Sequence, residues 1–459
     1  MPFKDFLTSL PEVKAPDQKY RSFKEKLKWT LTILIAYFLL GVIPLFGLGE
    51  NALQQFEFLS IILGAQFGSL ISLGIGPIVT SSIVLQLLVG SGLLKIDTTK
   101  HEDRVFFQGL QKVLSIFFII FEGLIYVFMG GLSPAAGFSP WILVFQLFLG
   151  GLLILYMDEV TSKWGFGSGV SLFIAAGVAS QIVISALSPL TTAGNLAFGS
   201  GQAPVGRIFV FFISLFQGNI LEAVLALSAI LATIAVFFIA VYAQAMKVEI
   251  PLSFGRVRGY GIRWPLSFIY TSNIPVILVA ALLANIQLWA RLLEKAGHPL
   301  LGTFSGNVPV AGIVAWIYSP NIIQDLLTGN FISINILKSL VYVAFMIIGS
   351  VIFSIFWVQT SGMDAKSQAK QIMASGLQVP GFRRDERVVE HILSRYIKPL
   401  TVMGAVTVGF LAALADLTGA LSRGTGILLA VMIIYKLYED IAHQHMMDMH
   451  PALRQFMKK

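Results

Sequence analysis

The sequence predicts an all-α polytopic membrane protein with ten transmembrane helices. Apolar residues make up 56% of the 459 residues and charged residues 12%, with a mean hydropathy of +0.79. This composition leaves too little polar surface to cover a soluble domain of that length. About ten apolar stretches have the roughly 20 residues that cross a hydrocarbon core about 30 Å thick. Lysines and arginines also collect in alternate gaps between those stretches.

The predicted spans follow one another along the whole chain. They lie near residues 29–46, 76–94, 105–129, 139–157, 168–188, 220–243, 265–290, 336–357, 399–415 and 424–440. The gaps on one side hold 27 of the 32 basic residues: seven in 1–28, four in 95–112, Lys163, four in 247–263, seven in 366–398 and four in 436–459. The other gaps hold only Arg207, Arg291, Lys295, Lys338 and Arg423. Because cytoplasmic loops carry the basic excess, we expect a multi-pass protein of the cell membrane with both termini in the cytosol.

The ends of the chain are expected to lie outside the bilayer. Residues 1–28 mix seven basic with four acidic residues, unlike a cleavable signal peptide. Phe23 and Leu27 lie four residues apart amid charge, which suits an amphipathic helix on the membrane surface. Residues 441–459 form the predicted cytosolic tail. The chain has no cysteine, which excludes disulfides, thiolate metal sites and thiol nucleophiles.

Two of the apolar stretches are interrupted. Residues 56–92 are about twice as long as one crossing and contain several glycines and Pro77, which predicts a short half-crossing helix near 56–70 before a full span. Asn273 and Pro275 interrupt the seventh stretch at the corresponding place in the second half. Breaks at matching positions favour two inverted five-helix halves, 29–190 and 191–440, with a pathway between them. The alternative is that glycine and proline are simply common in membrane helices, and no residue-level repeat decides between the two.

One carboxyl group is predicted at mid-membrane. Glu122 lies ten residues past Lys112, about 15 Å along a helix. A buried carboxyl group needs a hydrogen-bond partner, and Thr80 and Asn285 are polar residues in other spans that could supply one. A plain helix-to-helix hydrogen bond with no mechanistic role is the alternative.

Aliphatic side chains recur four residues apart where glycine-rich segments open two spans. Each of these pairs shares a helix face. With one residue from each of two further spans, they could form a hydrophobic ring that blocks ions by dewetting. The members of this predicted ring are Ile75, Val79, Val170, Ile174, Ile277 and Leu429. Ordinary helix packing produces the same spacing and is the competing explanation.

At these residues the chain closely resembles the SecY family of protein-translocation channels, in its archaeal form. The resemblance covers essentially the whole length. It rests on the segments 23–29, 74–80, 86–92, 107–111, 165–177, 248–251, 272–277, 284–289 and 424–429. It implies an hourglass channel between two clamshell halves, with the aliphatic ring as its constriction. Valine at position 170, where isoleucine is often found, is a mild departure from the family pattern.

The resemblance also implies roles for the remaining features. Residues 56–70 would form the plug, and Thr80, Glu122 and Asn285 would form the polar cluster of a lateral gate through which signal sequences of nascent polypeptides enter the lipid bilayer. The basic loops 247–264 and 359–398 would dock the ribosome or a motor through Arg256, Arg258 and Arg383; ordinary positive-inside charge is the alternative. SecE and Secβ, two small membrane subunits, are the implied partners.

The predicted function is passage of unfolded polypeptide across the membrane and lateral release of hydrophobic segments. No phosphate-binding loop, metal-ligand cluster or catalytic pair is evident, so no enzyme activity, cofactor or metal is expected. A small-molecule secondary transporter is the alternative, although it should carry more midplane charges than Glu122 alone. An intramembrane hydrolase would need paired aspartates within spans, whereas Asp158 and Asp416 lie at span ends.

Overall fold

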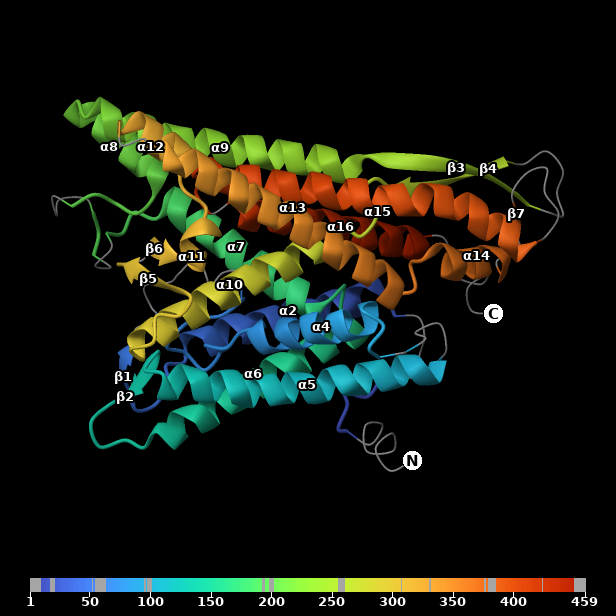
Figure 1. Ribbon diagram of the computed structural model, residues 1–459, viewed down its shortest axis with the longest axis horizontal. Coiled ribbons are helices and arrows are strands. Elements are labelled where there is room, and N and C mark those ends of the chain that lie inside the picture. Colours follow the sequence, from blue (N-terminus) through green and yellow to red (C-terminus); the bar gives the residue numbers. More distant parts are fainter. Residues whose placement is uncertain are drawn as a thin grey trace.

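The fold is described from a computed structural model, shown in Figure 1. The structure describes residues 10–16, 21–51, 53, 63–94, 96, 101–191, 195–197, 202–254, 261–306, 308–329, 332–374, 377–378, 385–422 and 424–449. Among these residues the fold is mostly helical, with three small sheets.

Each predicted span overlaps one helix. These helices are α2 (Phe23–Val42), α4 (Gly76–Gly90), α5 (His101–Phe128), α6 (Pro140–Trp164), α7 (Gly169–Leu187), α9 (Ile220–Ala245), α10 (Ile274–Lys295), α13 (Ile334–Thr360), α15 (Glu386–Leu417) and α16 (Gly424–Met449). Seven described helices are long and apolar enough to cross a membrane. The other three are α4, which has only 15 residues, and α2 and α16, which carry four charged residues each. A multi-pass membrane fold follows, while the number ten stays a prediction.

Shorter helices connect or flank the long ones. They are α8 (Arg207–Gln217), α11 (Ile313–Trp316), α12 (Ile322–Leu327) and α14 (Ala365–Ala374). The prediction that the seventh span starts at 265 was wrong, because α10 begins only at Ile274. Pro275 occupies the first turn of α10, where a proline has no backbone N–H to leave unpaired.

Three sheets lie at the two ends of the helical body (Figure 1). At one end β3 (Lys247–Phe254) pairs with both β4 (Gly261–Ser267) and β7 (Leu377–Gln378). At the opposite end are the pairs β1 (Leu48–Asn51) with β2 (Leu132–Pro134) and β5 (Gly302–Ser305) with β6 (Val308–Gly312). No strand was predicted from the sequence. We call the end that carries β3, β4, β7 and α14 the basic end, since the basic gaps fall there.

Two groups of helices pack side by side. α2, α4, α5, α6 and α7 form one, and α9, α10, α13, α15 and α16 form the other. They meet where α4 packs on α10 and α13, and where α7 packs on α16. The largest apolar core cluster lies across this junction and takes buried residues from both groups. The inverted relation of the two halves stays a prediction.

The predicted plug falls only partly within the described residues, since 56–62 lie outside them. Residues 63–70 form turns, so this part of the predicted short helix is wrong. Gly64 and Gly68 have φ of +51° and +96°, values that end a helix. A Cβ atom at Gly64 would lie 3.6 Å from Cγ2 of Ile75, so this turn lies against a residue of the aliphatic ring.

Candidate functional site

The six aliphatic residues of the predicted ring come from both groups: Ile75 immediately precedes α4, Val79 lies on α4, and the other four lie on α7, α10 and α16. Five of them (Ile75, Val79, Ile174, Ile277 and Leu429) are at most 5% exposed and belong to the same apolar core cluster. Val170 is half-buried and packs against that cluster. Residues about 350 positions apart in sequence therefore lie in one continuous apolar region between the two helix groups.

A cavity of about 580 Å³ lies on the basic side of this region. Three ring residues line it: Val79, Val170 and Ile277. The rest of its wall comes from α4, α5, α6, α10, the start of α7 and the end of α13, and includes Gln86, Gln111 and Asp158. A cavity that has polar side chains in its wall and reaches aliphatic side chains is the arrangement expected of a water-filled funnel above a hydrophobic constriction.

Asp158 positions one ring-bearing helix, α7. Its Oδ1 accepts a hydrogen bond from Val170 N–H at 2.9 Å, in the first turn of α7. A Cβ atom at Gly169 would lie 2.6 Å from the Asp158 Cα, so α6 and α7 meet here through a glycine. A carboxylate at a helix N-terminus satisfies free N–H groups and the helix dipole.

Asp416 has the same relation to α16. It is buried and accepts hydrogen bonds from Thr425 N at 2.7 Å, from the Thr425 hydroxyl and from the Tyr342 hydroxyl. Both aspartates lie at span ends, as the sequence indicated. That each aspartate caps the following helix could not be predicted from the sequence, because each cap depends on how the chain folds back on itself.

The predicted polar cluster is assembled from three helices. Thr80 Oγ1 on α4 donates to Glu122 Oε1 on α5 at 3.0 Å and accepts from Asn285 Nδ2 on α10 at 2.9 Å. All three residues are at most 7% exposed. Among the described residues, Glu122 Oε2 and Asn285 Oδ1 have no hydrogen-bond partner. The bond from Asn285 links α10 to α4 across the junction between the helix groups.

Comparisons with known proteins decide the family. The SecY family model matches residues 69–438, and the model of the plug domain of Sec61p matches residues 35–68. The chain belongs to the SecY family. The protein translocase subunit SecY of Methanothermobacter thermautotrophicus is 47% identical over 99% of this chain and 98% of its own length.

Solved SecY-family structures share the whole fold. One reports that the plug domain of SecY stabilises the closed state of the translocation channel and maintains a membrane seal; it matches with a TM-score of 0.82 and 42% identity, over 97% of this chain and 98% of its own. Sec61 in the canine ribosome-channel complex from the endoplasmic reticulum matches with a TM-score of 0.79 and 40% identity over the same shares.

The predicted docking arginines Arg256, Arg258 and Arg383 lie outside the described residues. The described strands beside them do form one unit in this SecY-family chain, because β3 pairs with β7 through Ser253 with Gln378 and Phe254 with Leu377. Lys247 at the start of β3 also forms an ion pair of 2.9 Å with Glu439 on α16. The bases of both predicted docking loops are therefore joined to each other and to the helical body.

Proposed function

We propose that this SecY-family protein is the channel subunit of a Sec translocase, through which unfolded polypeptides cross the membrane. The observation that carries the proposal is the aliphatic ring at the end of the 580 Å³ cavity. Flexible aliphatic walls fit around passengers of any sequence, and they exclude ions while the passage is empty. The channel performs no chemistry in this proposal, so a cytosolic partner supplies the energy.

Lateral release into lipid is proposed to occur between α4 and α10. The bond from Asn285 to Thr80 is a single neutral hydrogen bond across this contact. Such a bond contributes about 1 kcal/mol net, which an apolar signal segment moving from water to lipid can readily offset. The same bond is strong enough to favour closure when no signal is present.

Residues 56–70 are proposed to be the plug, and the family match at 35–68 supports this. The turn at Gly64 lies against the ring residue Ile75, which supports a plug beside the proposed constriction. Closure by the plug and by the ring would then act at the same place.

The proposed partners act from two directions. The match to a channel in a ribosome complex supports ribosome docking at loops 247–264 and 359–398, with Arg256, Arg258 and Arg383 binding RNA phosphates. This proposal places the basic end and both termini in the cytosol. SecE and Secβ are proposed as the membrane partners.

Transport into sealed vesicles tests the function against the secondary-transporter alternative. Vesicles would contain the purified protein with SecE and Secβ, and ribosomes carrying a signal-bearing nascent chain would be added. We expect protease-protected polypeptide inside the vesicles only with an intact signal. Uptake of labelled amino acids or sugars without any polypeptide passage would support a transporter.

A further inference from the structure

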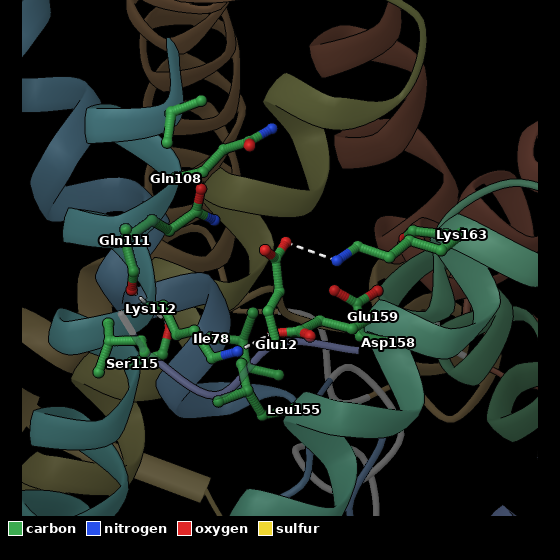
Figure 2. A pocket seen from close by; sticks show the side chains of 14 residues that line it. Glu12, Ile78, Gln108, Gln111, Lys112, Ser115, Leu155, Asp158, Glu159 and Lys163 are labelled. Carbon is green, nitrogen blue, oxygen red and sulfur yellow. Dashed lines mark hydrogen bonds and ion pairs between the residues drawn. The ribbon is translucent and has the colours of Figure 1, made fainter. Parts of the chain in front are cut away.

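The chain's own residues 10–14 lie in a groove between α5 and α6 at the basic end (Figure 2). We call residues 10–14 the strap. The groove belongs to a cavity of about 390 Å³ lined by Leu10 and Glu12 of the strap and by residues of both helices, including Lys112, Glu159 and Lys163. The strap has no helical or strand structure there.

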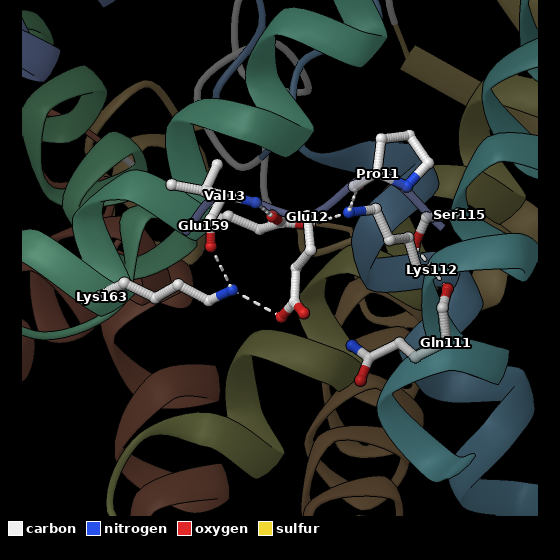
Figure 3. Close-up of polar contacts among 8 residues, drawn as sticks. All are labelled: Pro11, Glu12, Val13, Gln111, Lys112, Ser115, Glu159 and Lys163. Atoms are coloured by element: carbon white, nitrogen blue, oxygen red, sulfur yellow. Dashed lines mark hydrogen bonds and ion pairs between the residues drawn. The ribbon is translucent and has the colours of Figure 1, made fainter. Parts of the chain in front are cut away.

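The groove contacts the strap mainly through its backbone (Figure 3). Lys112 Nζ donates to the Pro11 carbonyl at 2.5 Å, and Lys163 Nζ to the Val13 carbonyl at 2.7 Å. In the other direction, Val13 N–H donates to Glu159 Oε2 at 2.9 Å. Trp164 Nε1 adds a bond of 2.9 Å to the Lys14 carbonyl. Carbonyl and N–H groups of an extended chain are available in nearly every sequence, so recognition of this kind is tolerant of side chains.

The groove is built around a shielded charge pair. Lys112 on α5 is 9% exposed and forms an ion pair with Glu159 on α6. Each member of the pair also bonds the strap, so the strap backbone completes the hydrogen bonding of two groups that have been largely removed from water. A groove without any extended segment would leave part of this bonding unmade.

The groove adjoins the central cavity of about 580 Å³. Ile78, Gln108, Gln111 and Asp158 line both the 390 Å³ cavity and the 580 Å³ cavity that ends on the ring. A polypeptide that fills the central cavity therefore passes directly beside the strap. The ion pair of Glu12 with Lys163, at 2.5 Å, involves a Glu12 side chain that is 63% exposed, and ion pairs this open are weak.

We propose that the α5–α6 groove is a binding site for an extended segment of the translocating polypeptide, and that the strap is its displaceable resident ligand. The inference rests on the proposed function. When the strap leaves, Lys112, Glu159, Lys163 and Trp164 present the same donors and acceptor to the backbone of the passing chain. The groove then holds that chain extended beside the mouth of the funnel.

Peptide binding to the full-length protein tests the groove itself. The probe is a fluorescent, end-capped peptide of residues 10–16, followed by anisotropy with the protein in nanodiscs. In a strap-released variant, Glu12→Lys with Val13→Pro, repulsion from Lys163 and loss of the Val13 N–H empty the groove. We expect this variant to bind the probe about tenfold or more tightly than the unchanged protein, whose groove is filled. Glu12→Lys alone is the second variant if the double change unfolds.

Two changes to the experiment distinguish recognition of the peptide backbone from nonspecific binding. A probe methylated on the Val13 nitrogen loses the bond to Glu159 and should bind about tenfold more weakly, whereas a probe of scrambled sequence should keep most of its affinity. Lys163→Met in the released background should also weaken binding. No binding by a folded released variant, or equal binding of the methylated probe, would overturn the site.

A photo-crosslinker at Ser162, which also lines the groove, tests the identity of the ligand. Stalled, signal-bearing nascent chains should be captured there, more strongly in the released variant, and excess unlabelled probe should compete. A parallel crosslinker at Val79 reports passage through the ring. Capture at Val79 but not at Ser162 would refute the groove proposal while leaving the channel intact, whereas failure at both positions would count against the proposed function.

Discussion

Asn285 on α10 donates a hydrogen bond of 2.9 Å to the hydroxyl of Thr80 on α4, and that hydroxyl in turn donates to Glu122. The buried side chain of Thr80 thus joins α10, on one side of the junction, to α4 and α5 on the other. Because α4 and α10 also carry the ring residues Val79 and Ile277, the lateral contact and the proposed constriction depend on the same two helices. Separation of α4 from α10 must alter both.

Replacing Thr80 by valine should favour the open gate. The substitution keeps the shape of the side chain but leaves the Asn285 amide and a Glu122 oxygen without their partner, a cost of about 1–3 kcal/mol to the closed state. Translocation of a polypeptide with a shortened signal should increase. Thr407→Val on α15 is the control, since Thr407 is half-buried and its hydroxyl donates to the Met403 carbonyl of its own helix. An unchanged or lower yield with Thr80→Val would contradict the gate role.

Two glycines in the first turn of α16 should respond differently to alanine. A Cβ atom at Gly424 would lie 2.1 Å from the Ala415 carbonyl carbon, whereas at Gly426 the nearest atom would be 3.4 Å away. Gly424→Ala should therefore destabilise the protein by about 1–3 kcal/mol or more, and Gly426→Ala should have little effect. Thermal unfolding in detergent measures both. Equal melting temperatures would show that the α15–α16 turn is not tightly packed.

Deleting residues 56–70 should leave a folded protein that leaks ions. The segment is proposed to block the channel, whereas the large core cluster between the helix groups holds the bundle together. Planar-bilayer conductance should rise above that of the intact protein, while the helical circular dichroism signal stays nearly unchanged. Conductance equal to that of the intact protein would exclude the plug role.

Reversing Arg256 and Arg383 to glutamate should weaken ribosome binding. Contacts to RNA phosphates depend on salt, so the difference from the unchanged protein should be largest at low ionic strength. Sedimentation of ribosomes with the detergent-solubilised protein at several salt concentrations measures this. Lys338→Glu, on the opposite side of the predicted topology, is the control. Equal binding of the double variant at every salt concentration would indicate that these arginines only orient the protein in the membrane.

Features that depend on local patterns of apolar and polar residues could be predicted from the sequence. The length of the apolar stretches located the helices. The polarity of Glu122, Thr80 and Asn285 within apolar spans indicated three side chains that do contact one another through Thr80. Other features depend on tertiary contact and could not be predicted. The pairing of β3 with β7 joins segments more than 120 residues apart, and the strap contacts α6 nearly 150 residues along the chain.

The interrupted segments were predicted only in part. Asn273 and Pro275 marked a real interruption, but α10 begins at Ile274, after residues 261–267 have formed a strand. In 63–70 the glycines were noted as breaks, and they end any helix there altogether. Local residue preferences indicated that the helices stop, while the placement of each end depends on the neighbours it packs against.

A photo-crosslinker at Val79 tests most directly whether polypeptide passes through the aliphatic ring. Stalled nascent chains of increasing length, with and without a functional signal, would be presented to membranes that contain the protein and its partners. We predict capture that requires the signal and that moves along the nascent chain as its length increases. Absence of capture, with the protein folded and its partners present, would contradict a polypeptide pore at this site.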